Sequence, residues 1–174
     1  PNSVRLASGR EISAKYILIA VGSWPAMPDL PGIEHAVSSN EMFHLEELPR
    51  RLVVIGGGYI AMEFAGIFNA LGSQVTLCTR SEALLRGYDR ALVDRLVQIS
   101  MARGIDIKLN APFERIEKDG DGTLQVHVGR GDPIPADVVL VATGRMPNTG
   151  GLGLESAGVE LGRNGAIAVD DQGK

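Results

Sequence analysis

The chain has 174 residues, a length that suits one domain together with pieces of a second. Its 21 acidic and 17 basic residues give no sign of a surface for nucleic acid or for a membrane. One cysteine excludes an intrachain disulfide framework, and no metal-ligand spacing is present, so we expect no metal and a cytoplasmic location. The 22 glycines and the low aromatic content of 5% favour an α/β fold.

The first apolar segment predicts a strand that closes a domain. "YILIAVGSWP" (residues 16–25) is an apolar run followed by A-x-G-x-x-P, with Gly22 as its glycine, and the short strands of "VRLASGREI" precede it. The same order returns at residues 124–147, where "VVLVATGRMP" contains Gly144. Both copies resemble the closing strand of a nucleotide-binding domain. The first copy lacks an opening glycine turn, so we expect that turn to lie before residue 1.

A β-α-β unit occupies the middle of the chain. Leu52–Ile55 is a short continuous apolar run, typical of a strand buried on both faces of a parallel sheet, and Val75–Cys78 predicts a second strand. Residues 52–71 have the length of a membrane span, but three glycines and a central Glu63 argue against insertion. Gly72 is suited to end the intervening helix. The apolar positions at helical spacing in that helix are Ile60, Phe64, Ile67, Phe68 and Leu71.

The turn between the first strand and the helix carries the dinucleotide-binding fingerprint G-x-G-x-x-A. Gly56 permits the tight turn, Gly58 lets a pyrophosphate approach the backbone, and Ala61 lets helix and strand pack closely. The pyrophosphate would lie on the N–H groups that open the helix, where the dipole favours negative charge. A glycine-rich turn shaped by packing alone is the alternative. The strand-helix-strand order favours the nucleotide site.

The end of the second strand bears on which dinucleotide is bound. NAD sites usually carry an acid about 20 residues past the glycine turn, whereas NADP sites have an arginine nearby. Here the neutral Thr79 is followed by Arg80, and Arg86 lies further along the same loop. Two guanidinium groups can hold a phosphate by forked, charge-assisted hydrogen bonds. We therefore predict NADPH, with merely solvated surface arginines as the alternative.

The segments after this loop continue the α/β pattern. Residues 105–109 predict a third parallel strand, and residues 113–128 predict a hairpin whose turn is "DGDG". Residues 91–103 predict an amphipathic helix, whose apolar positions are Leu92, Leu96, Val97 and Met101.

These elements together predict a fold class and a domain organisation. We expect an α/β, Rossmann-like dinucleotide-binding domain at residues 49–150, with a parallel sheet, helices and a β-meander or hairpin. We expect residues 1–48 to be the tail of an upstream dinucleotide-binding domain and a connector. We expect residues 151–174 to be a connector that leads away from the central domain again.

Three stretches resemble the NADPH domain of the flavoprotein pyridine nucleotide-disulfide oxidoreductases, within them the glutathione reductase type. They are "GGGYIAMEFAGIFNALGSQVTL", "RSEALLRGYD" and "ATGRMPNTGGLGLESAGV", and the resemblance runs over essentially the whole chain. It implies an FAD enzyme in which NADPH reduces the flavin, the flavin reduces an active-site disulfide, and the dithiol reduces a substrate such as glutathione disulfide. It implies that residues 1–48 are the tail of the FAD-binding domain with a connector, and that residues 151–174 are a connector leading back to that FAD domain. It also implies a homodimer formed through a C-terminal domain outside this chain.

The resemblance further implies roles for single residues. Tyr59 matches a tyrosine that covers the nicotinamide pocket, and Glu63 matches a glutamate that helps hold the nicotinamide end. Arg80 and Arg86 match the pair that holds the 2′-phosphate. Val21 departs from the family, which usually has threonine there. The complete set that we predict to bind cofactors is Gly22, Gly56, Gly58, Tyr59, Ile60, Ala61, Glu63, Arg80, Arg86, Gly144 and Arg145.

We expect no catalytic residue in this chain. The family's catalytic cysteines form a C-x-x-x-x-C pair, whereas Cys78 stands alone in a strand, where a cysteine is usually a small core residue. The chain alone should therefore bind NADPH without retaining FAD or reducing a disulfide. Two alternatives stay open. One is a relative of the trypanothione, mercuric or lipoamide type, and the other is a stand-alone NADPH-sensing module.

Overall fold

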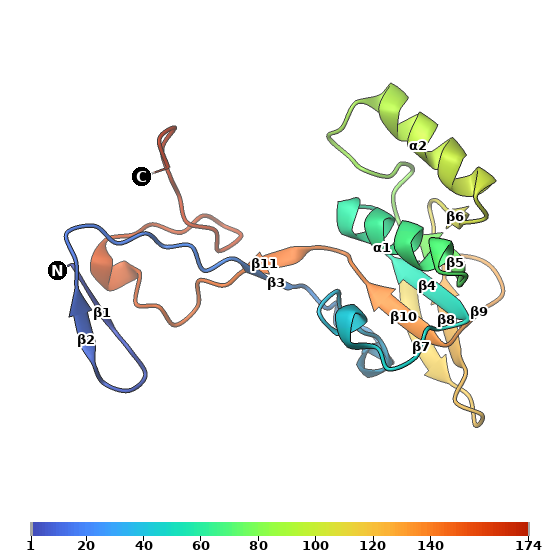
Figure 1. Ribbon diagram of the computed structural model, residues 1–174, viewed down its shortest axis with the longest axis horizontal. Coiled ribbons are helices and arrows are strands. Elements are labelled where there is room, and N and C mark those ends of the chain that lie inside the picture. The colour runs from blue at the N-terminus through green and yellow to red at the C-terminus, as the bar shows by residue number, and fades with distance from the viewer. Residues whose placement is uncertain (1, 174) are drawn as a thin grey trace. The chain divides into compact units, whose positions relative to one another are not determined.

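The structure is a computed structural model that describes residues 2–173. The chain divides into two compact units, coloured by position along the chain in Figure 1. The smaller unit joins the N-terminal segment up to Trp24 with the C-terminal segment from Arg145. The larger unit runs from Pro25 to Gly144 and therefore includes most of the connector predicted within residues 1–48.

The larger unit is built on a four-stranded parallel sheet with the order β10-β4-β5-β6 (Figure 1). This sheet confirms the predicted α/β class and the predicted third parallel strand. Short 3-10 helices, η1 (Ile33–His35) and η2 (Glu41–His44), lie in the connector, where Val37 bridges to Leu140. The main elements are β4 (Arg51–Ile55), α1 (Tyr59–Ala70), β5 (Gln74–Cys78), α2 (Arg90–Ala102), β6 (Asp106–Lys108) and β10 (Val138–Val141).

The central strands are buried on both faces, which explains their continuous apolar sequences. Leu52 and Val54 point to the face covered by α1, where they pack in one core with Phe64. Val53 points the other way and packs in a second core with Val126 of the antiparallel sheet. That second sheet has the order β7-β8-β9, with β7 (Phe113–Lys118), β8 (Leu124–Val128) and β9 (Ile134–Ala136). The parallel sheet is thus the middle layer of three.

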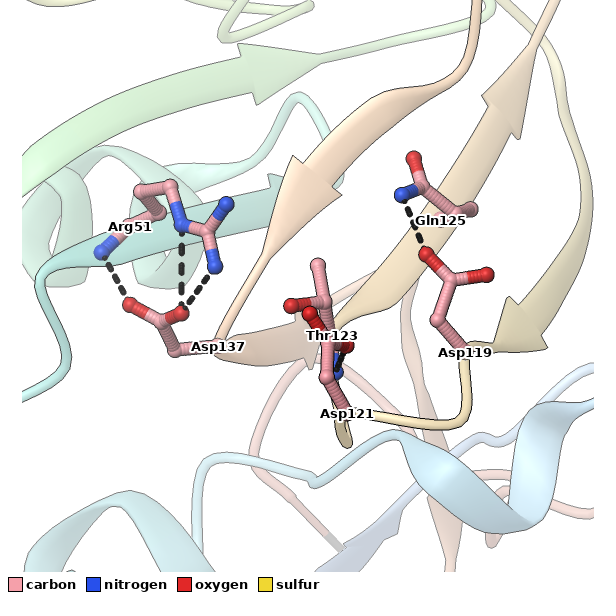
Figure 2. Close-up of polar contacts among 6 residues, drawn as sticks. All are labelled: Arg51, Asp119, Asp121, Thr123, Gln125 and Asp137. Carbon is pink, nitrogen blue, oxygen red and sulfur yellow. Dashed lines mark hydrogen bonds and ion pairs between the residues drawn. The ribbon is translucent and has the colours of Figure 1, made fainter.

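The predicted hairpin is confirmed by the antiparallel pair β7–β8. Its "DGDG" turn is closed by side chains drawn in Figure 2. Asp121 Oδ1 accepts from the Thr123 N–H at 2.9 Å, and Asp119 Oδ2 accepts from Gln125 Nε2 at 2.7 Å. The hydrogen bonds to Thr123 lower the pKa of Asp121. The short side chains of both aspartates thus stabilise the turn by accepting hydrogen bonds from residues two and six positions later in the chain.

The two helices agree closely with their predicted bounds, but α2 exposes part of its apolar face. Asp89 caps α2 by accepting from the Leu92 N–H at 3.1 Å, and Val93 is buried beneath it. Leu92 and Met101, however, are 72% and 55% exposed, because α2 lies over the sheet with Val93 and Val97 inward. Within residues 2–173, none of the helices combines the length and the apolar character that a bilayer span requires.

The smaller unit consists of short paired strands and loops. An antiparallel hairpin joins β1 (Ser3–Arg5) to β2 (Glu11–Ser13), β3 (Ser23–Pro25) pairs with β11 (Arg145–Pro147), and η3 (Glu155–Ala157) follows. The strand predicted from the apolar run at residues 16–22 is wrong. Tyr16 and Leu18 are 82% and 88% exposed. No strand within the described residues pairs with this run, and a strand needs a partner for its backbone groups.

A charged pair ties β4 to the junction of β9 and β10. Asp137 receives three hydrogen bonds from Arg51, one from the backbone N–H at 2.8 Å and two from the guanidinium at 2.5 and 3.1 Å (Figure 2). The Asp137 N–H donates in return to the Arg51 carbonyl at 3.0 Å. The hydrogen bonds from Arg51 hold the pKa of Asp137 below its ordinary value of 3.8. The junction of the two sheets is thereby fixed at the start of β4.

We expect the substitution Asp137→Asn to lower the free energy of unfolding by about 1 kcal/mol at pH 7, because the pair is partly exposed. A lowered folded-state pKa gives stability that is present above the unfolded pKa and is lost as pH falls through the folded pKa. The difference between wild type and variant should therefore shrink below pH of about 4. Urea denaturation from pH 7 to pH 2 measures this. A difference that stays constant with pH would contradict the ionic role of Asp137.

Candidate functional site

The glycine turn lies between β4 and α1, and its first glycine is required by packing. The Gly56 N–H donates to the Cys78 carbonyl at 2.9 Å, and Gly56 has a φ of +150°. A Cβ on Gly56 would lie 2.3 Å from the Ala142 carbonyl oxygen and 3.3 Å from the Cβ of Ala61. Ala61 itself is fully buried. The first and third positions of the fingerprint thus let β4, β10 and α1 approach closely, as the motif predicts.

Gly58 behaves differently from Gly56. It has a φ of −90°, which any residue can adopt, and a Cβ there would meet no atom within 4 Å. Nothing in the described chain therefore requires glycine at this position. In residues 2–173 no side chain caps the start of α1, so no side chain accepts a hydrogen bond from the first N–H groups of the helix. Such a helix start, with room in front of it, fits a phosphate group of a dinucleotide.

The arginine loop begins where β5 ends. Thr79 is 5% exposed, its N–H donates to the Lys108 carbonyl at 3.0 Å, and its Oγ1 accepts from the Ser81 N–H at 3.3 Å. Arg80 and Arg86 are exposed, and neither makes a side-chain hydrogen bond or ion pair within the described part of the chain. Both guanidinium groups are therefore available to an anion. No acidic side chain stands at the end of β5 to repel one.

Three further predicted residues lie on the first turns of α1. Tyr59 is 54% exposed, so its ring is available at the surface beside the glycine turn. The side chain of Ile60 packs against the core. Only its backbone N–H is therefore left to contribute to a ligand site at the start of α1. Glu63 is exposed and is the fifth residue of α1, and the first turn contains no acid. The helix dipole acts mainly within the first turn, so a favourable interaction with the dipole does not account for a glutamate at position 63.

The remaining predicted residues divide between the two units. Gly144 belongs to the larger unit, has a φ of +156°, and accepts from the Ala26 N–H at 3.0 Å. Gly22 and Arg145 belong to the smaller unit. Arg145 donates from Nε to the Ser23 hydroxyl at 2.6 Å and from Nη2 to the Ser23 carbonyl. Its guanidinium is therefore held by its own unit. Gly56–Ala61 and the two arginines follow β4 and β5 at one edge of the parallel sheet, and Gly144 follows the neighbouring strand β10.

Two contacts at this edge have no counterpart in the fingerprint. A Cβ on Gly57, a variable position of the motif, would lie 2.8 Å from Thr79 Oγ1. The Gly57 carbonyl also accepts from the Leu85 N–H at 2.7 Å, and Leu85 has a φ of +48°. The only sequence signal for the first contact was a glycine at the middle position of the three consecutive glycines. No sequence signal indicates the second, because leucine is uncommon in that conformation.

Cys78 is buried in the core, and His127 lies on the antiparallel sheet. Cys78 is fully buried and carries no disulfide, and burial raises the pKa of its thiol to about 12. A thiol in that state is a core group rather than a nucleophile. His127 Nε2 lies 3.1 Å from Glu117 Oε2 on the antiparallel sheet. Residues 2–173 contain no cluster of three or more His, Cys, Asp or Glu that could hold a metal ion.

Comparisons with known proteins agree with this geometry. Trypanothione reductase of Trypanosoma congolense is 49% identical over 163 residues, and glutathione reductase of Burkholderia cepacia is 44% identical over 171 residues. These matches cover 92% and 98% of this chain but 33% and 38% of the relatives. The chain therefore spans about a third of the length of these relatives.

The solved structures and the family model give the same result. The HOCl-induced flavoprotein disulfide reductase RclA of Escherichia coli superimposes with a TM-score of 0.87 at 36% identity, over 97% of this chain and 39% of that one. The family model described as pyridine nucleotide-disulphide oxidoreductase matches residues 2–174. With its parallel sheet and glycine turn, this chain belongs to the pyridine nucleotide-disulphide oxidoreductase family.

Proposed function

We propose that this chain is the NADPH-binding segment of a flavin-dependent disulfide reductase of the glutathione reductase type. The observation that carries the proposal is the edge of the parallel sheet, where two unpaired guanidinium groups and an uncapped helix start follow neighbouring strands. Because β4 and β5 are parallel, their carboxyl ends share this edge, and open α/β sheets bind ligands there. A neutral Thr79 in place of an acid supports NADPH over NADH.

Each part of the proposed site has a physical task. The N–H groups from Gly58 to Ala61, that of Ile60 included, hold the pyrophosphate, and the open space at Gly58 admits it. Arg80 and Arg86 hold the 2′-phosphate by charge-assisted hydrogen bonds. Tyr59 covers the nicotinamide end and Glu63 helps to hold it. Bound NADPH supplies a hydride for reduction of the flavin, and Gly144 lies against the nicotinamide nucleotide in this proposal.

The proposal extends to the whole protein, of which FAD is the second cofactor. In this proposal residues 49–150 are the NADPH-binding domain, residues 1–48 are the tail of the FAD-binding domain with a connector, and residues 151–174 lead back to that FAD domain. The smaller unit supports this, because it leaves large apolar side chains such as Leu18 and Trp24 88% and 64% exposed. Gly22 and Arg145 belong to the smaller unit, and in this proposal they lie on the flavin side.

The proposed parent is a cytoplasmic homodimer that reduces a small disulfide such as glutathione disulfide. Its catalytic cysteines and histidine are supplied by other parts of the protein, so this chain alone binds NADPH without catalysis. A trypanothione-type activity is the second candidate, since the relative of that name is 49% identical over the matched residues.

The first test is calorimetric titration with 2′,5′-ADP and with 5′-AMP, which differ only in the 2′-phosphate. We expect this chain to favour 2′,5′-ADP by about 2 kcal/mol, roughly 30-fold, because charge-assisted hydrogen bonds are strong. High salt should reduce the difference, since both arginines are exposed. The double substitution Arg80→Ala and Arg86→Ala should abolish the preference and leave 5′-AMP binding intact.

The matched control is Arg95→Ala, which removes another exposed arginine of the larger unit, on α2. It should change neither affinity. Equal affinity of the wild type for the two ligands would contradict the proposal and favour the NADH-linked relatives of the family.

A second test compares two glycines of the turn. Gly58→Ala should change the free energy of unfolding by less than about 1 kcal/mol, because its φ is permitted and its Cβ meets nothing. It should nevertheless weaken NADPH binding about tenfold or more, because the Cβ occupies the space for the pyrophosphate. Gly56→Ala should instead destabilise the fold by about 2–4 kcal/mol, through the clash with the Ala142 carbonyl.

Urea denaturation and NADPH titration of both variants measure these effects. If Gly58→Ala binds NADPH as tightly as the wild type does, the space in front of Gly58 is not the pyrophosphate site.

A further inference from the structure

We propose that Leu85 is a positioning residue for the NADPH site, through its backbone N–H rather than its side chain. It joins the arginine loop, residues 79–89, to the glycine turn, and so sets the 2′-phosphate arginines against the pyrophosphate site. This inference rests on the proposed function, because it concerns how the same site is held in shape.

The contact itself is a single short backbone hydrogen bond. The Leu85 N–H donates to the Gly57 carbonyl at 2.7 Å. To make this bond, Leu85 adopts a left-handed backbone conformation with a φ of +48°. In the described chain the only other non-glycine residue with a positive φ is Asn110, and asparagine tolerates that conformation far better than leucine. The cost for a leucine is on the order of 1–3 kcal/mol, so surrounding contacts must hold it.

The surrounding contacts that hold this conformation are visible on both sides of Leu85. Leu84 is 2% exposed and belongs to the core beneath α1, so the chain is fixed immediately before Leu85. The Tyr88 N–H donates to the Leu85 carbonyl at 3.1 Å, which closes a turn immediately after it. Strain held in this way by a well-determined environment is often associated with a functional site.

The hydrogen bond orients the peptide that faces the proposed pyrophosphate. In a trans peptide the carbonyl and the following N–H point in opposite directions, and the described residues contain no cis peptide bond. Because Leu85 engages the Gly57 carbonyl, the Gly58 N–H points away from the arginine loop. Gly58 is exposed, with no atom within 4 Å of its Cβ position. In the proposed site, this exposed peptide donates its N–H to the pyrophosphate.

The same hydrogen bond fixes the position of the Arg86 backbone, because Arg86 directly follows Leu85. The loop is anchored near its start, because the Asn110 N–H donates to the Ser81 carbonyl at 3.0 Å. Leu85 provides the second anchor, directly before Arg86. The segment between Ser81 and Leu85 is thus tied at both ends, and Arg80 and Arg86 flank it. A change in the Leu85 conformation would move Arg86 relative to the glycine turn.

The competing explanation is that Leu85 only packs, since its side chain is half-buried against the core beneath α1. Two substitutions separate these roles. Leu85→Ile keeps an apolar side chain of the same size, but a β-branched residue strongly disfavours a positive φ. Leu85→Asn removes the apolar packing, but asparagine accepts a positive φ. Leu92→Ile is the matched control, because it makes the same chemical change at an exposed position of α2.

The experiment is titration of all four proteins with 2′,5′-ADP and 5′-AMP, together with urea denaturation of each. We expect Leu85→Ile to weaken 2′,5′-ADP binding about tenfold or more and to reduce the preference over 5′-AMP at least about threefold. Leu85→Asn should stay within about threefold of the wild type despite a lower stability, and Leu92→Ile should match the wild type. Affinities that instead follow the stability of each variant would overturn the inference and leave only a packing role.

The outcomes also separate this inference from the proposed function. A wild type that does not prefer 2′,5′-ADP contradicts the function itself. A wild type that prefers it, alongside an unchanged Leu85→Ile, overturns the role of Leu85 alone.

Amide hydrogen exchange of the wild type gives an independent measurement should Leu85→Ile fail to fold. The Leu85 N–H should be protected in the free protein and more strongly protected with 2′,5′-ADP bound. An amide that exchanges freely in both states would also overturn the inference.

Discussion

Close approach between the glycine turn and the backbone beside it is the contact on which the rest of the site depends. Gly56 has no room for a side chain because the Ala142 carbonyl of the segment after β10 lies against it. Gly57 is confined in the same way by the hydroxyl of Thr79, which follows β5. The turn is thus enclosed by the ends of the strands on either side of β4. This enclosure holds the start of α1 at the carboxyl edge of the sheet.

Thr79 unites two properties that sequence motifs treat separately. Its side chain is buried against the glycine turn and accepts a hydrogen bond from the Ser81 N–H, so it belongs to the structure of the loop. The same residue occupies the position where an acid would bind a ribose hydroxyl in an NAD site. In the proposed NADPH site, therefore, one buried neutral residue both supports the turn and leaves no acid directly before Arg80.

The two units differ in how complete their cores are and in which of them carries the proposed nucleotide site. The larger unit has a complete three-layer core and contains the whole of the proposed nucleotide edge. The smaller unit has short strands, a guanidinium held by Ser23, and apolar side chains such as Leu18 open to solvent. The family match covers both units, although the geometry that supports NADPH binding lies in the larger one alone. The proposed flavin chemistry correspondingly needs parts of the protein beyond this chain.

Local patterns in the sequence were sufficient wherever neighbouring residues decide the structure. The bounds of β4, β5, α1 and α2 follow from apolar periodicity and turn residues, which act over one or two turns or a single strand. The glycine fingerprint and the two arginines could be recognised in the sequence for the same reason, because each is a short local pattern. The apolar run at residues 16–22 failed as a strand because strand formation also requires a partner, which periodicity does not report. The exposure of Leu92 likewise depends on which face α2 turns to the sheet.

The sequence by itself determined the α/β class, the family resemblance and the chemical types of the candidate residues. Only the tertiary structure decided which glycines are required by packing and which leave room for a ligand. It alone brought Leu85 against Gly57, since a backbone hydrogen bond between distant segments depends on the path of the chain and not on side-chain type. A leucine with a positive φ contradicts its own local preference, and such a conflict is resolved only by the contacts of the folded chain.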